Sequence, residues 1–264
     1  METNVFKGLM RKEWLLLRNS FIFLLCTMFF VWFAGLGWSV FTGNATILLI
    51  ISIMFIIAHV LYVTWIVGAG LHMEEKSQLW LHNPHSTSKL LGSKLVTAIY
   101  LQSVSILFAL LLLTLTVNVA AADMIGKFEM ESLTINSVVS VLVQVMVSGL
   151  ELGMYYMFFW IIYHVMGQFH YILKFRVVLF ILFIVLLFML VGYVESHLWT
   201  VLERVVSPQL EMAKFMNFYI EEGGVGVRSS AENITIAGII VTLLKVIGLF
   251  SLSSWLLNKV VEVR

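Results

Sequence analysis

Long apolar runs separated by short polar segments make up most of this chain of 264 residues. A helix needs about 20 apolar residues to cross a hydrocarbon core of about 30 Å, because each residue adds about 1.5 Å along the axis. Six runs reach that length, at residues 21–41, 45–70, 95–121, 137–166, 177–194 and 235–257. The pattern therefore predicts an all-α membrane protein with six transmembrane helices in a single domain over residues 1–264.

The segment before the first run has an amphipathic helical pattern. Its apolar and basic residues fall on different sides of a helical wheel: Val5, Phe6, Leu9, Met10, Leu16 and Leu17 against Lys7, Arg11 and Arg18. Glu13 is the exception, because it falls on the apolar side. The pattern predicts an interfacial helix over residues 1–20, with its cations toward lipid headgroups, although a basic tail without a fixed helix is the alternative.

The longest polar segment between runs covers residues 195–234. Apolar residues recur at helical spacing from Leu198 to Val206, and a second apolar set surrounds Phe215 and Phe218. Pro208 separates the two sets. The spacing predicts two short helices on the membrane surface, between the fifth and sixth spans.

Composition and charge narrow the class of protein. Apolar residues form 61% of the chain and charged residues only 12%, which excludes an ordinary soluble domain. The net charge is +1 and the basic residues are dispersed, so a nucleic-acid partner is not expected. Cys26 is the only cysteine, and the chain therefore has no internal disulfide.

The distribution of basic residues predicts the orientation. Most of the 16 Lys and Arg residues lie in the N-terminal segment, after the second and fourth runs, and in the C-terminal tail. The other side holds only Lys127, Arg204, Lys214 and Arg228. Cytoplasmic segments retain Lys and Arg, so we expect a multi-pass protein of the cell membrane with both termini cytoplasmic.

Two charged residues lie inside the predicted spans. At about 1.5 Å per residue, Glu151 and Lys245 are about 21 Å and about 15 Å from the external ends of spans four and six. An ionisable group at such depth usually faces a partner or a wet cavity. Gln144, Ser148 and Tyr155 extend Glu151 into a polar stripe. The sequence leaves two interpretations open, a translocation route or a structural ion pair.

The same span carries Gly149 and Gly153, four residues apart. Small residues at this spacing let a second helix approach closely. We expect such a contact on the side of the helix roughly opposite the polar stripe.

No catalytic or metal-binding motif accompanies these charges. HExxH does not occur, and the Glu74-Glu75 pair begins like the EExxxR motif of intramembrane proteases, but Leu79 stands where that motif needs Arg. The GxxxxGK[ST] phosphate loop is also missing from the sequence. We therefore expect no catalytic residue, no metal and no cofactor on this chain.

The polar segment 74–94 joins the second and third spans. Residues 75–82 can form a short helix, and Asn83 is pushed out of the helical region because Pro84 follows it. Ser86 or Ser88 can cap the helix that continues into span three. A short helix tied at both ends to membrane helices cannot move without moving them.

This segment resembles the coupling-helix loop of ABC-2 type transporter permeases. The resemblance rests on acidic and basic residues, a leucine-rich short helix, a proline, a small hydroxyl residue and a leucine pair with a lysine: Glu74, Glu75, Lys76, Leu79, Leu81, Pro84, Ser86, Leu90, Leu91 and Lys94. The six spans, the N-terminal helix and the cytoplasmic termini also fit that family.

The resemblance implies the transmembrane subunit of an ABC exporter, which pairs with a second copy or a related permease. A separate ATPase subunit would bind ATP and Mg²⁺ and dock on the loop. The implied docking residues are Glu74, Glu75, Lys76, Leu79, Trp80, Leu81, Pro84 and His85. Leu79, Trp80 and Leu81 would be buried in the docking site, with Glu75, Lys76 and His85 at its rim.

Two other classes stay open at this point. A non-transporting immunity or sensor protein could bind a peptide or lipid through residues 195–234. A membrane-embedded enzyme would need several catalytic side chains at one depth, which Glu151 and Lys245 alone do not supply.

Overall fold

The computed structural model describes residues 2–77, 86–123, 135–168, 173–205, 214–221, 224–231 and 236–261. Within these residues, six helical segments are long and apolar enough to cross a membrane: Val5–Thr42, Thr46–Glu75, Thr87–Val119, Val141–Met166, Arg176–Leu198 and Ile240–Lys259. The six predicted spans are confirmed. The chain is therefore a multi-pass membrane protein.

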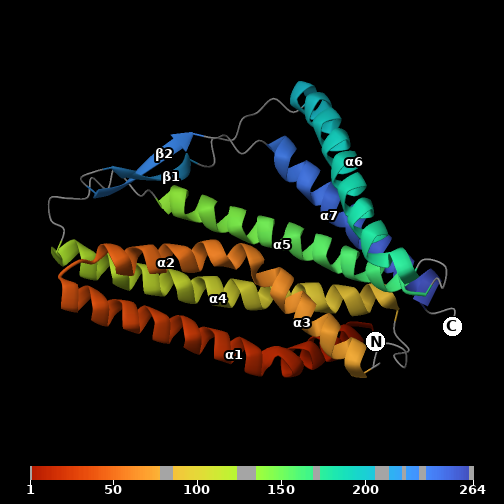
Figure 1. Ribbon diagram of the computed structural model, residues 1–264, viewed down its shortest axis with the longest axis horizontal. Coiled ribbons are helices and arrows are strands. Elements are labelled where there is room, and N and C mark those ends of the chain that lie inside the picture. Colours follow the sequence, from red (N-terminus) through yellow and green to blue (C-terminus); the bar gives the residue numbers. More distant parts are fainter. Residues whose placement is uncertain are drawn as a thin grey trace.

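Figure 1 shows a helical bundle from which one helix, α6 (Arg176–Val205), leans away. Its elements in chain order are α1 (Glu2–Thr42), α2 (Thr46–Ala58), the 3₁₀ turn η1 (His59–Leu61), α3 (Tyr62–Ser77), α4 (Thr87–Asp123), α5 (Ile135–Met166), the 3₁₀ turn η2 (Leu173–Phe175), α6 (Arg176–Val205), β1 (Lys214–Glu221), β2 (Gly224–Ala231), α7 (Ile236–Leu256) and the π-helical turn η3 (Leu257–Val261). Helices α1 to α5 pack along one another, and α7 packs on α5. Helix α6 contacts mainly α7 and leans away from the bundle.

Helix α1 is continuous over 41 residues, so the helix predicted at residues 1–20 is not separate from the first span. Leu9, Leu17 and Phe21 are buried, and α1 packs along α4. The apolar side of residues 5–17 thus faces protein instead of a membrane surface. Its first turns and the end of α7 lie at the same end of the bundle, here called the N-terminal end (Figure 1).

The segment between α6 and α7 also differs from the prediction of two short helices. Helix α6 continues to Val205 and includes the first of them. In place of the second, β1 and β2 form an antiparallel hairpin, with Lys214 opposite Ala231 and Glu221 opposite Gly224. Residues 215–220 are rich in aromatic residues, which favour a strand over a helix. The all-α prediction therefore holds for the spans and not for this segment.

A 3₁₀ turn interrupts the second span at His59. The carbonyl oxygen of His59 accepts a hydrogen bond from Gln102 Nε2 at 3.0 Å, and its ring Nε2 lies 2.9 Å from Ser105 Oγ. All three side chains are buried. Polar groups in hydrocarbon need partners, so α4 supplies them at the point where the span departs from regular α-helix.

The two glycines of α5 pack against this interrupted span, which confirms the predicted close contact. A Cβ atom at Gly149 would lie 2.6 Å from Gln102 Nε2, and one at Gly153 would lie 2.5 Å from Val63 Cγ1. Real Cβ atoms do not approach so closely. Only glycine therefore lets α5 reach η1 and the start of α3.

We predict that Gly153→Ala destabilises the protein, whereas Gly37→Ala stabilises it. Both changes gain about 0.8–1.0 kcal/mol of helix propensity. At Gly153 the new methyl group also overpacks against Val63, at a cost of about 1–3 kcal/mol, while at Gly37 nothing lies within 4 Å. Thermal unfolding in detergent measures the difference, and equal shifts for the two variants would contradict the close contact.

Candidate functional site

The segment proposed to dock a partner lies partly within the described structure. Glu74 and Glu75 are on the last turns of α3, and Lys94 is on the second turn of α4. Lys76 is also on α3, but its side chain lies outside the described residues. The other docking residues predicted from the sequence also lie outside them: Leu79, Trp80, Leu81, Pro84 and His85.

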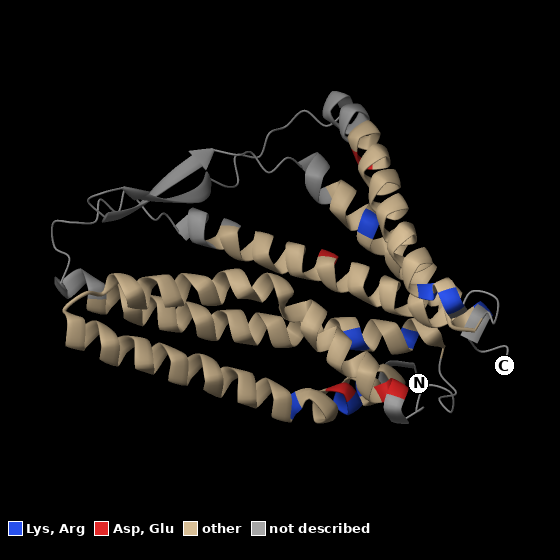
Figure 2. Ribbon diagram, viewed as in Figure 1, with Lys and Arg blue, Asp and Glu red and all other residues tan. Residues whose placement is uncertain are grey.

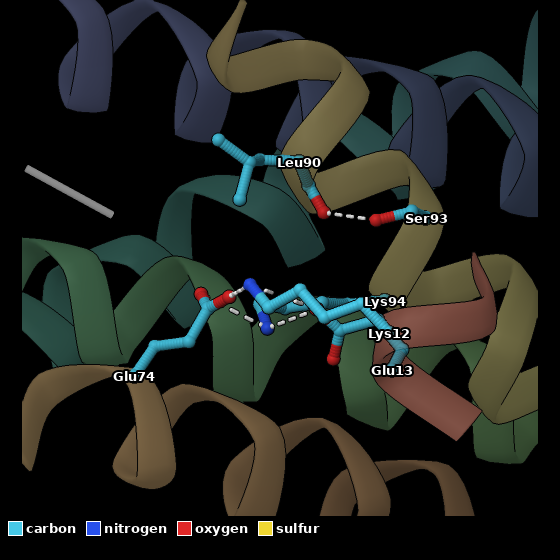
Figure 3. A network of polar contacts seen from close by, with 6 residues as sticks. All are labelled: Lys12, Glu13, Glu74, Leu90, Ser93 and Lys94. Carbon is cyan, nitrogen blue, oxygen red and sulfur yellow. Dashed lines mark hydrogen bonds and ion pairs between the residues drawn. The ribbon is translucent and has the colours of Figure 1, made fainter. Parts of the chain in front are cut away.

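Glu74 does not belong to an exposed docking surface, because its side chain turns into the bundle. Lys94 Nζ lies 3.0 Å from Glu74 Oε2 and 2.9 Å from Glu13 Oε1. Lys12 Nζ bonds the other oxygen of Glu74. Figure 3 shows the two lysine nitrogens between the carboxylates. Glu74 was predicted as a docking residue, but in the structure it is buried and paired with Lys12 and Lys94.

These four residues, here called the ion clasp (Lys12, Glu13, Glu74 and Lys94), form a compact neutral set. Glu13, Glu74 and Lys94 are only 0%, 4% and 2% exposed. A buried charge costs several kcal/mol unless it is paired, so each member depends on the others. The clasp therefore ties α1, α3 and α4 together at the N-terminal end.

The sequence contained one signal for the clasp. Glu13 was the acidic residue on the otherwise apolar side of the first helix, and in the structure this side packs into the bundle. A charge on an apolar helix face indicates a buried partner. The identity of that partner, Lys94, could not be read from the sequence because it lies 81 positions away.

Glu75 points in another direction from Glu74. Its Oε1 lies 2.9 Å from His164 Nε2, and its Oε2 lies 3.5 Å from His72 Nδ1. The Glu75 side chain is 43% exposed. It ties α3 to the end of α5 while staying accessible.

A second charged group joins α5, α6 and α7. Lys245 Nζ lies 2.6 Å from Glu151 Oε1, and 3.2 Å and 3.3 Å from the two oxygens of Glu195. The structure thus brings together the two intramembrane charges that the sequence singled out. The sequence did not identify Glu195 as a partner of Lys245, because the predicted fifth span ends just before it. In the structure, α6 continues past Glu195 without interruption.

This triad borders a cavity of about 470 Å³. The residues around it come from all three helices: Ser148, Glu151, Leu152, Tyr155, Phe188, Val191, Gly192, Glu195 and Lys245. Ser148 and Tyr155 of the predicted polar stripe are among them, whereas Gln144 is not. Figure 2 shows that few of the described charged residues lie along the bundle away from its N-terminal end, so this group is set apart from most of the others.

In the part of the chain that the structure describes, no group of three or more His, Cys, Asp or Glu residues could hold a metal ion. In comparisons with known proteins, the chain matches no family model, no curated protein and no solved structure.

We predict that Lys94→Met lowers the free energy of unfolding by about 3–5 kcal/mol, because it leaves two buried carboxylates with Lys12 alone. Lys259→Met is the matched control, since Lys259 is exposed on η3. Thermal unfolding of both variants in detergent tests the clasp. Equal unfolding temperatures would show that Lys94 contributes no more than a surface lysine.

Proposed function

We propose that this chain is the membrane-spanning permease subunit of an ABC exporter in the cell membrane, with both termini cytoplasmic. A separate ATPase subunit would dock on residues 78–85 and drive transport. The observation that carries the proposal is the Glu74–Lys94 ion pair, which joins the two stems of that segment at 3.0 Å.

The ion pair has a mechanical consequence. Residues 78–85 connect the end of α3 to the start of α4, and the pair holds these two helix ends together. Lys94 also holds Glu13 of α1. A force applied to the segment would therefore move three helices as one body, which is what a subunit driven by an external motor requires.

The energy source in this proposal belongs to another chain. The sequence has no GxxxxGK[ST] loop, so ATP and Mg²⁺ would bind to the partner ATPase. The second permease copy, or a related permease, follows from the resemblance of residues 74–94 to ABC-2 coupling loops. Glu75 and Lys76 would lie at the rim of the docked surface, next to Leu79, Trp80 and Leu81.

We predict that the full-length tagged chain, purified from the membranes of its native cells, carries a P-loop ATPase that mass spectrometry identifies. The double variant Leu79→Asp, Leu81→Asp should lose this ATPase while staying in the membrane, because two carboxylates would be buried in the docking site. Asn44→Asp is the control. It adds a charge at the opposite end of the bundle and keeps the oxygen that accepts the Thr46 N–H.

Two results would refute the docking proposal. One is a purified chain without any P-loop ATPase, and the other is an ATPase that binds the double variant as well as the unaltered chain. Loss of the ATPase with Asn44→Asp as well would show a general effect of added charge.

The proposed orientation has its own test. In a Cys26→Ser background, which removes the only native thiol, Ser86→Cys should react with a membrane-impermeant maleimide only after the cells are opened. Thr42→Cys, at the other end of α1, should react in intact cells. The reverse labelling pattern would invert the topology.

A further inference from the structure

Among the residues that the structure describes, the cavity beside Lys245 has an excess of negative charge. Glu151 and Glu195 each carry one negative charge and Lys245 carries one positive charge, so the formal sum is −1. The ion clasp, by contrast, pairs two acids with two bases. A purely structural ion pair needs no third charge, and an uncompensated carboxylate near hydrocarbon is costly. The unequal set points to a cationic group that completes it.

The carboxylates can still accept hydrogen bonds from a ligand. Lys245 binds Glu151 through Oε1, and among the described residues Glu151 Oε2 has no hydrogen-bond partner. Glu151 is not buried away from the cavity, since its side chain is 24% exposed. The side chain of Glu195 is 42% exposed. Both acids therefore present oxygen atoms to whatever occupies the cavity.

Apart from Ser148, the rest of the wall is apolar and aromatic. The Tyr155 and Phe188 rings lie 5.3 Å apart between centroids, and Leu152 and Val191 line the same space. A cation beside aromatic rings gains further attraction from their negative faces. Such a wall fits the hydrocarbon or ring system of an amphiphile.

Space for that body is left by Gly192. A Cβ atom added there would meet nothing within 4 Å, although Gly192 lines the cavity. None of the residues in the most apolar window of α6 is buried within the chain, and α6 leans away from α5 (Figure 1). The cavity is thus reachable from the side, in the region where an amphiphile dissolved in the membrane would reside.

From these features we propose that the cavity between α5, α6 and α7 binds an organic monocation with an apolar body. Its cationic group would lie against Glu151 and Glu195, and its body against Tyr155 and Phe188. This inference rests on the proposed export function and names the chemical class of the cargo. It depends on the cavity itself and not on the docking segment, because Glu151 and Lys245 lie in the middle of α5 and α7 and the segment follows the end of α3.

The test is direct binding to the purified chain in nanodiscs of phosphatidylcholine, a lipid without net charge. The probe is rhodamine 6G, a monocationic aromatic dye, and binding is followed by fluorescence polarisation. Fluorescein, a related ring system with negative charge, is the ligand control. We expect saturable binding of rhodamine 6G and none of fluorescein.

Two variants assign the binding to the cavity. Glu151→Gln keeps the shape and removes the charge excess, so we expect at least a tenfold loss of affinity. Gly192→Leu places a bulky side chain in the space where an added Cβ meets nothing within 4 Å, so binding should be lost while the unfolding temperature is kept. Gly248→Leu is the matched control, because a Cβ at Gly248 of α7 also meets nothing within 4 Å and this residue does not line the cavity.

Equal affinity of rhodamine 6G for the unaltered chain and the three variants would overturn the inference. Equal binding of rhodamine 6G and fluorescein would also overturn it, since either result means that the dye partitions into lipid. Absence of saturable rhodamine 6G binding to the unaltered chain would also overturn it. Copurification of the ATPase is scored on the same samples. ATPase binding without dye binding rejects the cargo class alone, whereas dye binding without an ATPase rejects the ABC exporter.

Discussion

Charge buried inside the helical bundle is the constraint on which the N-terminal end of this protein depends. Glu13, Glu74 and Lys94 are almost fully buried, and each would cost several kcal/mol without a partner of opposite sign. Lys94 lies between the two carboxylates at 2.9 Å and 3.0 Å. The requirement for neutrality therefore holds α1 against the bundle. It also sets the distance between the end of α3 and the start of α4.

The triad in the middle of α5 and α7 obeys the same electrostatics with a different outcome. Lys245 is shared by Glu151 and Glu195, so one carboxylate is left in excess, and the side chains of all three stay partly exposed beside a cavity. Buried ion pairs whose charges sum to zero hold helices together. Partly exposed charges with a net negative sum can still bind a cation. The roles that we propose for the two clusters, transmission of force and recognition of a ligand, rest on this difference.

A continuous packed path lies between these clusters. Helix α3 carries Glu74 at one end and contacts Gly153 of α5 through Val63 at the other. Gly149 and Gly153 flank Glu151 in the sequence of α5, on the side of the helix against η1 and α3. Movement of α3 would therefore press on the helix that carries Glu151. Close packing at glycine makes this contact stiff, because there is no flexible side chain to absorb a displacement.

The sequence by itself determined the six spans, the intramembrane charges at Glu151 and Lys245, and the close contact at Gly149 and Gly153. These features depend on local properties, namely run length, charge within an apolar run and residue spacing. Only the tertiary structure decided that residues 5–17 face protein, that Glu74 turns inward to Lys94, and that Glu195 joins Lys245. Residues 214–231 became a hairpin because strand pairing depends on a partner segment, which helical spacing in one segment does not reveal. The partner of a buried charge likewise lies far away in the sequence, and helix packing alone selects it.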